Sequence, residues 1–261
     1  QMRWRELASA AQFTGGGSVS LVEWDGNVSW DVVHNSRDTL ALWRTETTGA
    51  GMLQSLDTQR LPLNSNAIAN TLGSLTTDLD NDSWTDVVLY GTGGIHVLRG
   101  GPQDLQALPV VPLSTDAVEN VIVRDFDGDG LNDILQLAAG KVSILQNQTE
   151  STGHFLDVYF IGIDDNASGR VNHYAIGSTL ELRFGPHYRA TVITDRLSRF
   201  GLGNTTSADA LRAILPNGIT QNVIKPPLDT RIVEEQTLKG SCPFLYAWDG
   251  QQYAFVTDCL W

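Results

Sequence analysis

The chain has 261 residues, a formal net charge of −13 and an apolar content of 41 %. This length is enough for one large or two medium domains with sizeable cores. The acidic balance argues against a nucleic-acid partner, because phosphate binding needs clustered Lys and Arg. No segment approaches the ~20 apolar residues of a membrane span. The first residues, QMRWRELASAAQF, lack the apolar stretch of a signal peptide. The chain starts without Met and stops on Leu-Trp, so we expect a mature or excised piece of something longer.

Three acidic segments in the first half repeat one spacing. They are EWDGNVSWD (23–31), DLDNDSWTD (78–86) and DFDGDGLND (125–133). In the last two, Asp occupies positions 1, 3, 5 and 9, whereas the first has Glu at position 1 and Asn at position 5. An apolar run follows each segment, as expected for a loop between two strands. Three strand-and-turn units of about fifty residues each are typical of β-propeller blades.

The acidic spacing predicts metal sites. Asp side chains two residues apart, on a chain curled by glycines, can converge their oxygens on one point, and Ca²⁺ takes six to eight oxygens at ~2.3–2.6 Å. The candidate ligands of the two complete segments are Asp78, Asp80, Asp82 and Asp86, and Asp125, Asp127, Asp129 and Asp133. Weaker candidates for a third site are Glu23, Asp25, Asn27 and Asp31.

These segments have two other interpretations. An EF-hand also begins with alternating Asp, but it needs flanking helices and Glu at position 12. Leu89 and Gln136 occupy that position here, and the flanks are β-branched, so the EF-hand is excluded. The second interpretation is that the Asp side chains only make solvated Asx turns. It stays open, chiefly for the first segment.

The pattern Asp-x-Asp-x-Asp-Gly-x-x-Asp between strands resembles the FG-GAP or VCBS repeat, over about residues 15–148. The resemblance implies integrin α-like propeller blades whose loops bind Ca²⁺. It adds the main-chain carbonyls of Trp84 and Leu131 as ligands. Three blades cannot close a ring, because propellers typically use four to eight. We therefore expect further blades upstream of Gln1, or an open arc packed against a partner.

The second half, from about Thr149, lacks such loops. Its strand-like runs include HFLDVYFIGI (154–163), STLELRF (178–184) and YRATVIT (188–194). Seven short strands in about ninety residues predict an antiparallel β-sandwich or barrel. NHYAIGSTLEL, then RFGLGNTTSADALRAILPNG and VEEQ, resemble an ASPIC/UnbV domain over about residues 153–236. That resemblance implies a secreted, propeller-associated protein such as the cartilage acidic protein family and related bacterial proteins.

The tail SCPFLYAWDGQQYAFVTDCLW (241–261) predicts a β-hairpin. A four-residue loop would pair Trp248 with Tyr253 and Tyr246 with Phe255. It would also place Cys242 opposite Cys259, within reach of a disulfide. A two-residue turn would put the cysteines on a diagonal, and two reduced, buried thiols are the other alternative. We expect the hairpin to begin a further, truncated module.

The sequence thus predicts an all-β protein: a partial propeller (residues 1–150), a β-sandwich-like domain (151–238) and a terminal β-hairpin (239–261). No nucleophile with a base, His-rich cluster or phosphate loop is visible, so we expect no enzyme. We expect a secreted or cell-surface, Ca²⁺-binding structural or adhesion protein that presents a rigid β surface to a protein or glycan. The alternatives are a propeller-based carbohydrate-active enzyme or biosynthetic accessory protein, and a subunit of an extracellular filament, in which copies of the chain contact one another.

Overall fold

The computed structural model describes residues 17–36, 39–47, 53–62, 71–102, 105, 108–150, 153–163, 170–237 and 244–258. Within these ranges the chain forms β-strands and no α-helix, so the all-β prediction is confirmed. No helix in the described part is long and apolar enough to cross a membrane.

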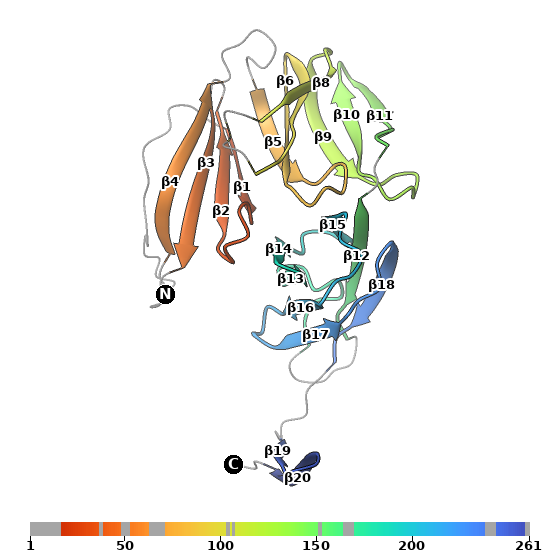
Figure 1. Ribbon diagram of the computed structural model, residues 1–261. Helices are drawn as coiled ribbons and strands as arrows, with labels where there is room; N and C mark the ends of the chain where they lie inside the picture. Colours follow the sequence, from red (N-terminus) through yellow and green to blue (C-terminus); the bar gives the residue numbers. More distant parts are fainter. Residues whose placement is uncertain are drawn as a thin grey trace, which may run out of the picture.

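Three sheets of the first half are arranged as β-propeller blades (Figure 1). Each is an antiparallel meander in chain order, and the first strands β1, β5 and β9 contact one another in sequence. The first sheet is β1 (Ser18–Val22), β2 (Asp31–Asn35), β3 (Thr39–Thr47) and β4 (Leu53–Pro62). The second is β5 (Thr71–Thr77), β6 (Asp86–Gly91), β7 (Gly94–Leu98) and β8 (Val110–Ser114). Within the described residues, the third consists of β9 (Val118–Arg124), β10 (Asp133–Ala138) and β11 (Lys141–Leu145).

The middle sheet is covered on both faces, which explains the unbroken apolar run of β6. Val87 and Leu89 belong to the core shared with the first sheet, and Val88 belongs to the core shared with the third. All three side chains are at most 1 % exposed. A strand with one solvated face would alternate apolar and polar residues, whereas a strand buried on both faces needs a continuous run.

The second half forms two sheets around one apolar core, as predicted for a β-sandwich. One sheet contains β12 (His154–Ile161), β15 (Ser198–Gly203) and β18 (Thr230–Glu235). The other contains β13 (Thr179–Phe184), β14 (His187–Val192), β16 (Ala210–Ile214) and β17 (Thr220–Ile224). The prediction of purely antiparallel pairing is wrong in one place, because β12 and β18 pair in parallel. The chain between them passes through the other sheet, and a connection of that length permits parallel pairing.

The terminal hairpin pairs β19 (Phe244–Trp248) with β20 (Tyr253–Asp258). The predicted pairs Trp248–Tyr253 and Tyr246–Phe255 are confirmed, and the Trp248 and Tyr253 rings meet edge to face at 5.4 Å. Beyond Tyr246 the register shifts by one residue, a bulge that the uniform pairing did not predict. The predicted Cys242–Cys259 disulfide lies outside the described residues.

One buried group gives this fold a testable pH dependence. His96 on β7 is 5 % exposed, and burial lowers its pKa below 6.5. The unfolded chain therefore takes up the proton at a higher pH than the folded chain, so stability falls as the pH drops below about 6.5. We expect the wild type to lose up to about 1.4 kcal/mol per pH unit relative to His96→Leu.

Urea unfolding between pH 7.5 and 5.5 measures this difference. Buried carboxylates titrate alike in both proteins, so the comparison isolates His96. The exposed His187 offers the control variant His187→Gln. Parallel pH profiles for the wild type and His96→Leu would contradict the assignment.

Candidate metal centre

The last aspartate of each acidic segment closes its loop in the same way. Asp31, Asp86 and Asp133 are at most 1 % exposed and begin the second strands of their sheets. Each carboxylate accepts one backbone N–H from seven residues earlier and one from fourteen residues later. These donors are Trp24 (3.0 Å) and Thr45 (2.8 Å), Leu79 (2.9 Å) and Gly100 (2.7 Å), and Phe126 (3.0 Å) and Asn147 (2.7 Å). The degenerate segment 23–31 therefore folds like the two complete ones.

Positions 3 and 5 of each loop form Asx turns. In the third loop Asp127 accepts the N–H of Asp129 at 3.1 Å, and Asp129 accepts that of Leu131 at 2.8 Å. The first and second loops repeat both bonds through Asp25, Asn27, Asp80 and Asp82. The Asx-turn interpretation is thus part of the structure. It does not compete with metal binding, because the same turns curl the chain so that the carboxylates converge.

In every loop the chain is curled by left-handed backbone at positions 4 and 6. In the third loop these positions are Gly128 and Gly130, with φ of 82° and 95°. Residues at the same positions of the other loops, such as Val28 at 70°, also have positive φ. A β-branched residue in this region is strained, so the third loop adopts the shared conformation with the least backbone cost.

Two groups of carboxylates converge closely enough to hold a metal ion. Their oxygens lie within 4.8 Å of one another, and the groups are Asp78, Asp80 and Asp82, and Asp125, Asp127 and Asp133. Asp86 and Asp129 fall outside these groups, and within the described residues no such group forms at Glu23–Asp31. In that first loop Asn27 is held by the backbone, since its Nδ2 donates to the Thr45 carbonyl at 2.7 Å. The roles of the Trp84 and Leu131 carbonyls stay predictions.

The donor set of the second loop fits a cation. Oδ1 of Asp78 is buried and accepts no hydrogen bond. Burial, followed by the charges of Asp86 and Asp82, raises the pKa of Asp78 well above its usual value. Burial likewise raises the pKa of Asp86 to about 7. Carboxylates that resist ionisation in this way need a nearby positive charge to stay charged at neutral pH.

The first loop has a similar but longer side chain at position 1. Glu23 is 2 % exposed, and neither carboxylate oxygen accepts a hydrogen bond. Its ion-pair partner is Arg189, whose Nη1 lies 3.5 Å from Oε2. Burial raises the pKa of Glu23 to about 7, although Arg189 opposes the shift.

Side chains that the sequence pattern missed place positive charge or hydrogen-bond donors at the loops. One set repeats with the blades, thirteen residues after each closing aspartate, and contacts position 3. Arg44 lies 3.8 Å from Asp25, Arg99 pairs with Asp80, and Gln146 donates to Asp127 at 2.6 Å. This spacing is readable from the sequence once the repeats are aligned.

The other arginines come from the second half and carry no local signal. Arg199 on β15 is buried between Asp125 (2.9 Å) and Asp157 (2.6 Å). It therefore joins the third loop to Asp157 on β12. Burial opposes ionisation of Asp125, but hydrogen bonds from Arg199 and two backbone N–H groups outweigh it and lower the pKa. Arg189 donates through Nε to the Ser83 carbonyl at 2.6 Å and lies over the Trp84 ring.

The glycines of FGLG (200–203) allow this close approach. A Cβ on Gly201 would lie 2.0 Å from Oδ2 of Asp78, and the Gly203 N–H donates to the Asn81 carbonyl at 2.8 Å. These glycines therefore bring β15 onto the second loop. The second and third loops lie between their own sheets and the second half of the chain (Figure 1).

Comparison with known proteins agrees with this geometry. A family model described as an FG-GAP-like repeat matches residues 78–136, the stretch that contains both converging carboxylate groups. No curated protein matches the chain, and no solved structure matches it.

The closing aspartates should be structural even without metal. Asp133→Ala removes two hydrogen bonds to a charged acceptor, each worth about 1.5–3 kcal/mol. We expect unfolding in urea, with chelator present, to show a loss of about 3–6 kcal/mol. The matched control is Asp129→Ala in the same loop, whose side chain is exposed and should cost about 1 kcal/mol. Equal losses for the two variants would contradict the closing role.

Proposed function

We propose that this chain is a non-enzymatic, Ca²⁺-binding β-propeller module of a secreted or cell-surface protein. The observation that carries the proposal is the convergence of two Asp triads in loops of identical backbone design. The buried, unpaired Oδ1 of Asp78 supports it, because a desolvated carboxylate oxygen without a donor suits a hard cation. The match of an FG-GAP-like repeat over the same residues gives independent support.

The residues that would hold Ca²⁺ are Asp78, Asp80 and Asp82 in the second loop and Asp125, Asp127 and Asp133 in the third. Bound cations would neutralise carboxylates that otherwise repel one another, so each loop would be better ordered with metal. Extracellular modules bind Ca²⁺ at about 10⁻⁴–10⁻³ M. At the roughly millimolar calcium expected outside cells, such sites would be about half to nine-tenths occupied.

The second half would act as an ASPIC/UnbV-like domain fixed to the propeller. The buried Arg199–Asp157 and Arg199–Asp125 pairs favour a fixed attachment, because all three side chains are at most 7 % exposed. Together the two parts would present a rigid β surface to a protein or glycan, which is a structural or adhesive role. No reaction is part of the proposal.

Calcium should stabilise the wild-type protein. For each site with the affinity above, 10 mM Ca²⁺ adds about 1.4–2.7 kcal/mol, which corresponds to a rise in melting temperature of roughly 3–10 °C. Differential scanning fluorimetry in Ca²⁺ and in chelator measures this shift. Asp127→Ala should remove much of it, whereas Asp116→Ala, an exposed aspartate outside the loops, should keep it. Identical melting curves in Ca²⁺ and in chelator would sink the proposal.

Arg99 provides a test that separates the two sites. Its guanidinium pairs with Asp80 where the third loop has the neutral Gln146 beside Asp127. We expect Arg99→Gln, which copies the third loop, to tighten Ca²⁺ binding at the second loop by about tenfold, because a competing charge is removed. Calorimetric titration measures the affinities. Gln146→Glu is the complementary variant, because it adds a negative charge at the third loop and should tighten Ca²⁺ binding there. Weaker Ca²⁺ binding at the second loop of Arg99→Gln would contradict the proposed competition between Arg99 and Ca²⁺.

A further inference from the structure

Among the described residues, the third sheet has no outer strand like the fourth strands of the first two sheets. In those sheets the third strand pairs on its outer side with an antiparallel fourth strand, β3 with β4 and β7 with β8. In the third sheet β11 pairs only with β10, and no strand within the described ranges pairs with its other edge. The backbone N–H and C=O groups along that edge are therefore not used by a sheet ladder.

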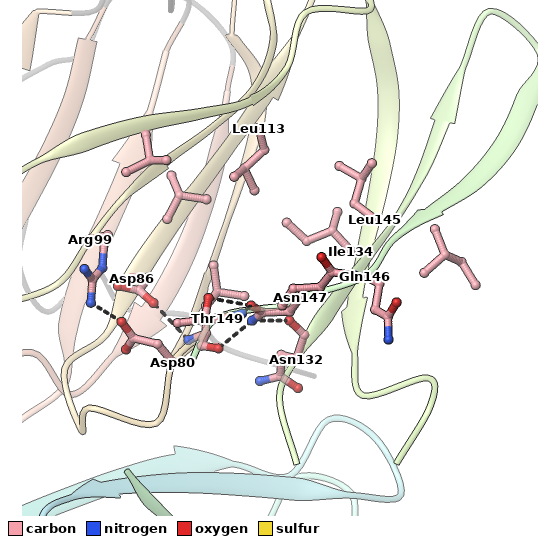
Figure 2. A pocket seen from close by; sticks show the side chains of 15 residues that line it. Asp80, Asp86, Arg99, Leu113, Asn132, Ile134, Leu145, Gln146, Asn147 and Thr149 are labelled. Atoms are coloured by element: carbon pink, nitrogen blue, oxygen red, sulfur yellow. Dashed lines mark hydrogen bonds and ion pairs between the residues drawn. The ribbon is translucent and has the colours of Figure 1, made fainter. Parts of the chain in front are cut away.

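A groove of about 760 Å³ lies beside this edge, between the second and third sheets (Figure 2). One wall comes from the second sheet and includes Val97, Val111 and Leu113, and the other comes from the third sheet and includes Ile134 and Leu145. Val111 and Leu113 are 37 % and 43 % exposed although they lie on the face that packs toward the third sheet.

The register of the strands shows what would fill the groove. Val123, Ile134 and Leu145 form one row across the third sheet, and all three pack in the core shared with the second sheet. Among the described strands the row ends at β11. In the second sheet the row at the same offsets from the closing aspartate runs through Val87 and Leu98 and continues to Val110 on the fourth strand. A fourth strand beside β11 would thus place its own apolar side chain over Val111 and Leu113.

The open edge also lacks the proline that the outer strands of the first two sheets carry. β8 contains Pro112 and β4 ends with Pro62, and proline prevents a further strand from pairing. β11, with the sequence KVSIL, contains no proline and has β-branched residues at alternate positions. Its Val142 and Ile144 side chains are 61 % and 51 % exposed. Such an edge is suited to accept an added strand.

We propose that β11 and this groove bind an extended segment of a partner polypeptide by strand addition. The segment would pair antiparallel with β11 and complete the third sheet as its fourth strand. Main-chain hydrogen bonds would supply affinity, and apolar side chains at alternate positions would enter the groove. The internal repeat defines the chemistry of the segment, because β8 fills the equivalent position of the second sheet with the sequence VVPLS.

The test uses the whole chain and a fluorescent peptide with the sequence of residues 108–116, LPVVPLSTD. Binding is measured by anisotropy, and amide hydrogen exchange of residues 141–145 is followed in parallel. We expect saturable binding together with slower exchange along β11. A peptide N-methylated at alternate residues cannot complete the ladder and should bind at least about tenfold more weakly.

Two neighbouring valines provide matched variants of the protein. Val111 lines the groove, and Val110 has a similar exposure of 40 % on the opposite face of the same strand. Val111→Lys should weaken peptide binding about tenfold or more, because it puts a charge among the apolar residues that form this wall of the groove. Val110→Lys should change it less than about twofold. Thermal melts confirm that both variants are folded.

Three results would overturn the proposal. The first is no binding of the unmodified peptide at 1 mM. The second is equal weakening by Val110→Lys and Val111→Lys. The third is a dimer in light scattering that buries the β11 edge and that the peptide does not dissociate, because the occupant would then be a second copy of the chain.

Discussion

The blades depend on one repeated interaction, the pair of backbone hydrogen bonds accepted by the buried carboxylate that closes each acidic loop. Asp31, Asp86 and Asp133 each join the start of the second strand to the loop before it and to the end of the third strand. Each satisfies two backbone N–H groups that no sheet ladder reaches, and hydrogen bonds to a charged acceptor are the stronger kind. Burial opposes this arrangement and raises the pKa of Asp31 to about 6. Each blade therefore needs hydrogen-bond donors or positive charges near its acidic loop to stabilise the ionised closing aspartate.

Nearby donors supply that compensation in two ways. A donor thirteen residues after the closing aspartate comes from the same blade, and it is Arg44, Arg99 or Gln146. Arg189 and Arg199 come from the second half and contact the first and third loops. The third loop has a neutral donor of its own and so relies on Arg199. The second half of the chain thus supplies positive charge to the acidic loops of the propeller, besides covering them.

The features of this structure that repeat or alternate along the chain were predictable from the sequence. The offsets of the acidic segments predicted the loops, the apolar runs predicted the strands, and the Trp248–Tyr253 pairing followed from loop length. Arg199 was missed, because the residue lies 74 positions from Asp125 and nothing local marks a contact at that separation. The parallel pairing of β12 with β18 was missed for the same reason. It depends on where distant segments meet rather than on local periodicity.

The shared use of Asp125 links metal binding to the contact between the two halves. Arg199 keeps Asp157 as a partner whether or not Asp125 is engaged, since its Nε lies 2.6 Å from Asp157. A cation at the third loop would compete with the Arg199 guanidinium for Asp125, but Arg199 would keep its ion pair with Asp157. Any free energy by which metal weakens that contact must equal the free energy by which the contact weakens metal binding. The second loop meets the second half through glycine backbone, the Gly203–Asn81 hydrogen bond and the Arg189–Ser83 hydrogen bond, and none of these uses a carboxylate oxygen of the Asp78 triad. Metal at the third loop should therefore be coupled to the position of the second half more strongly than metal at the second loop.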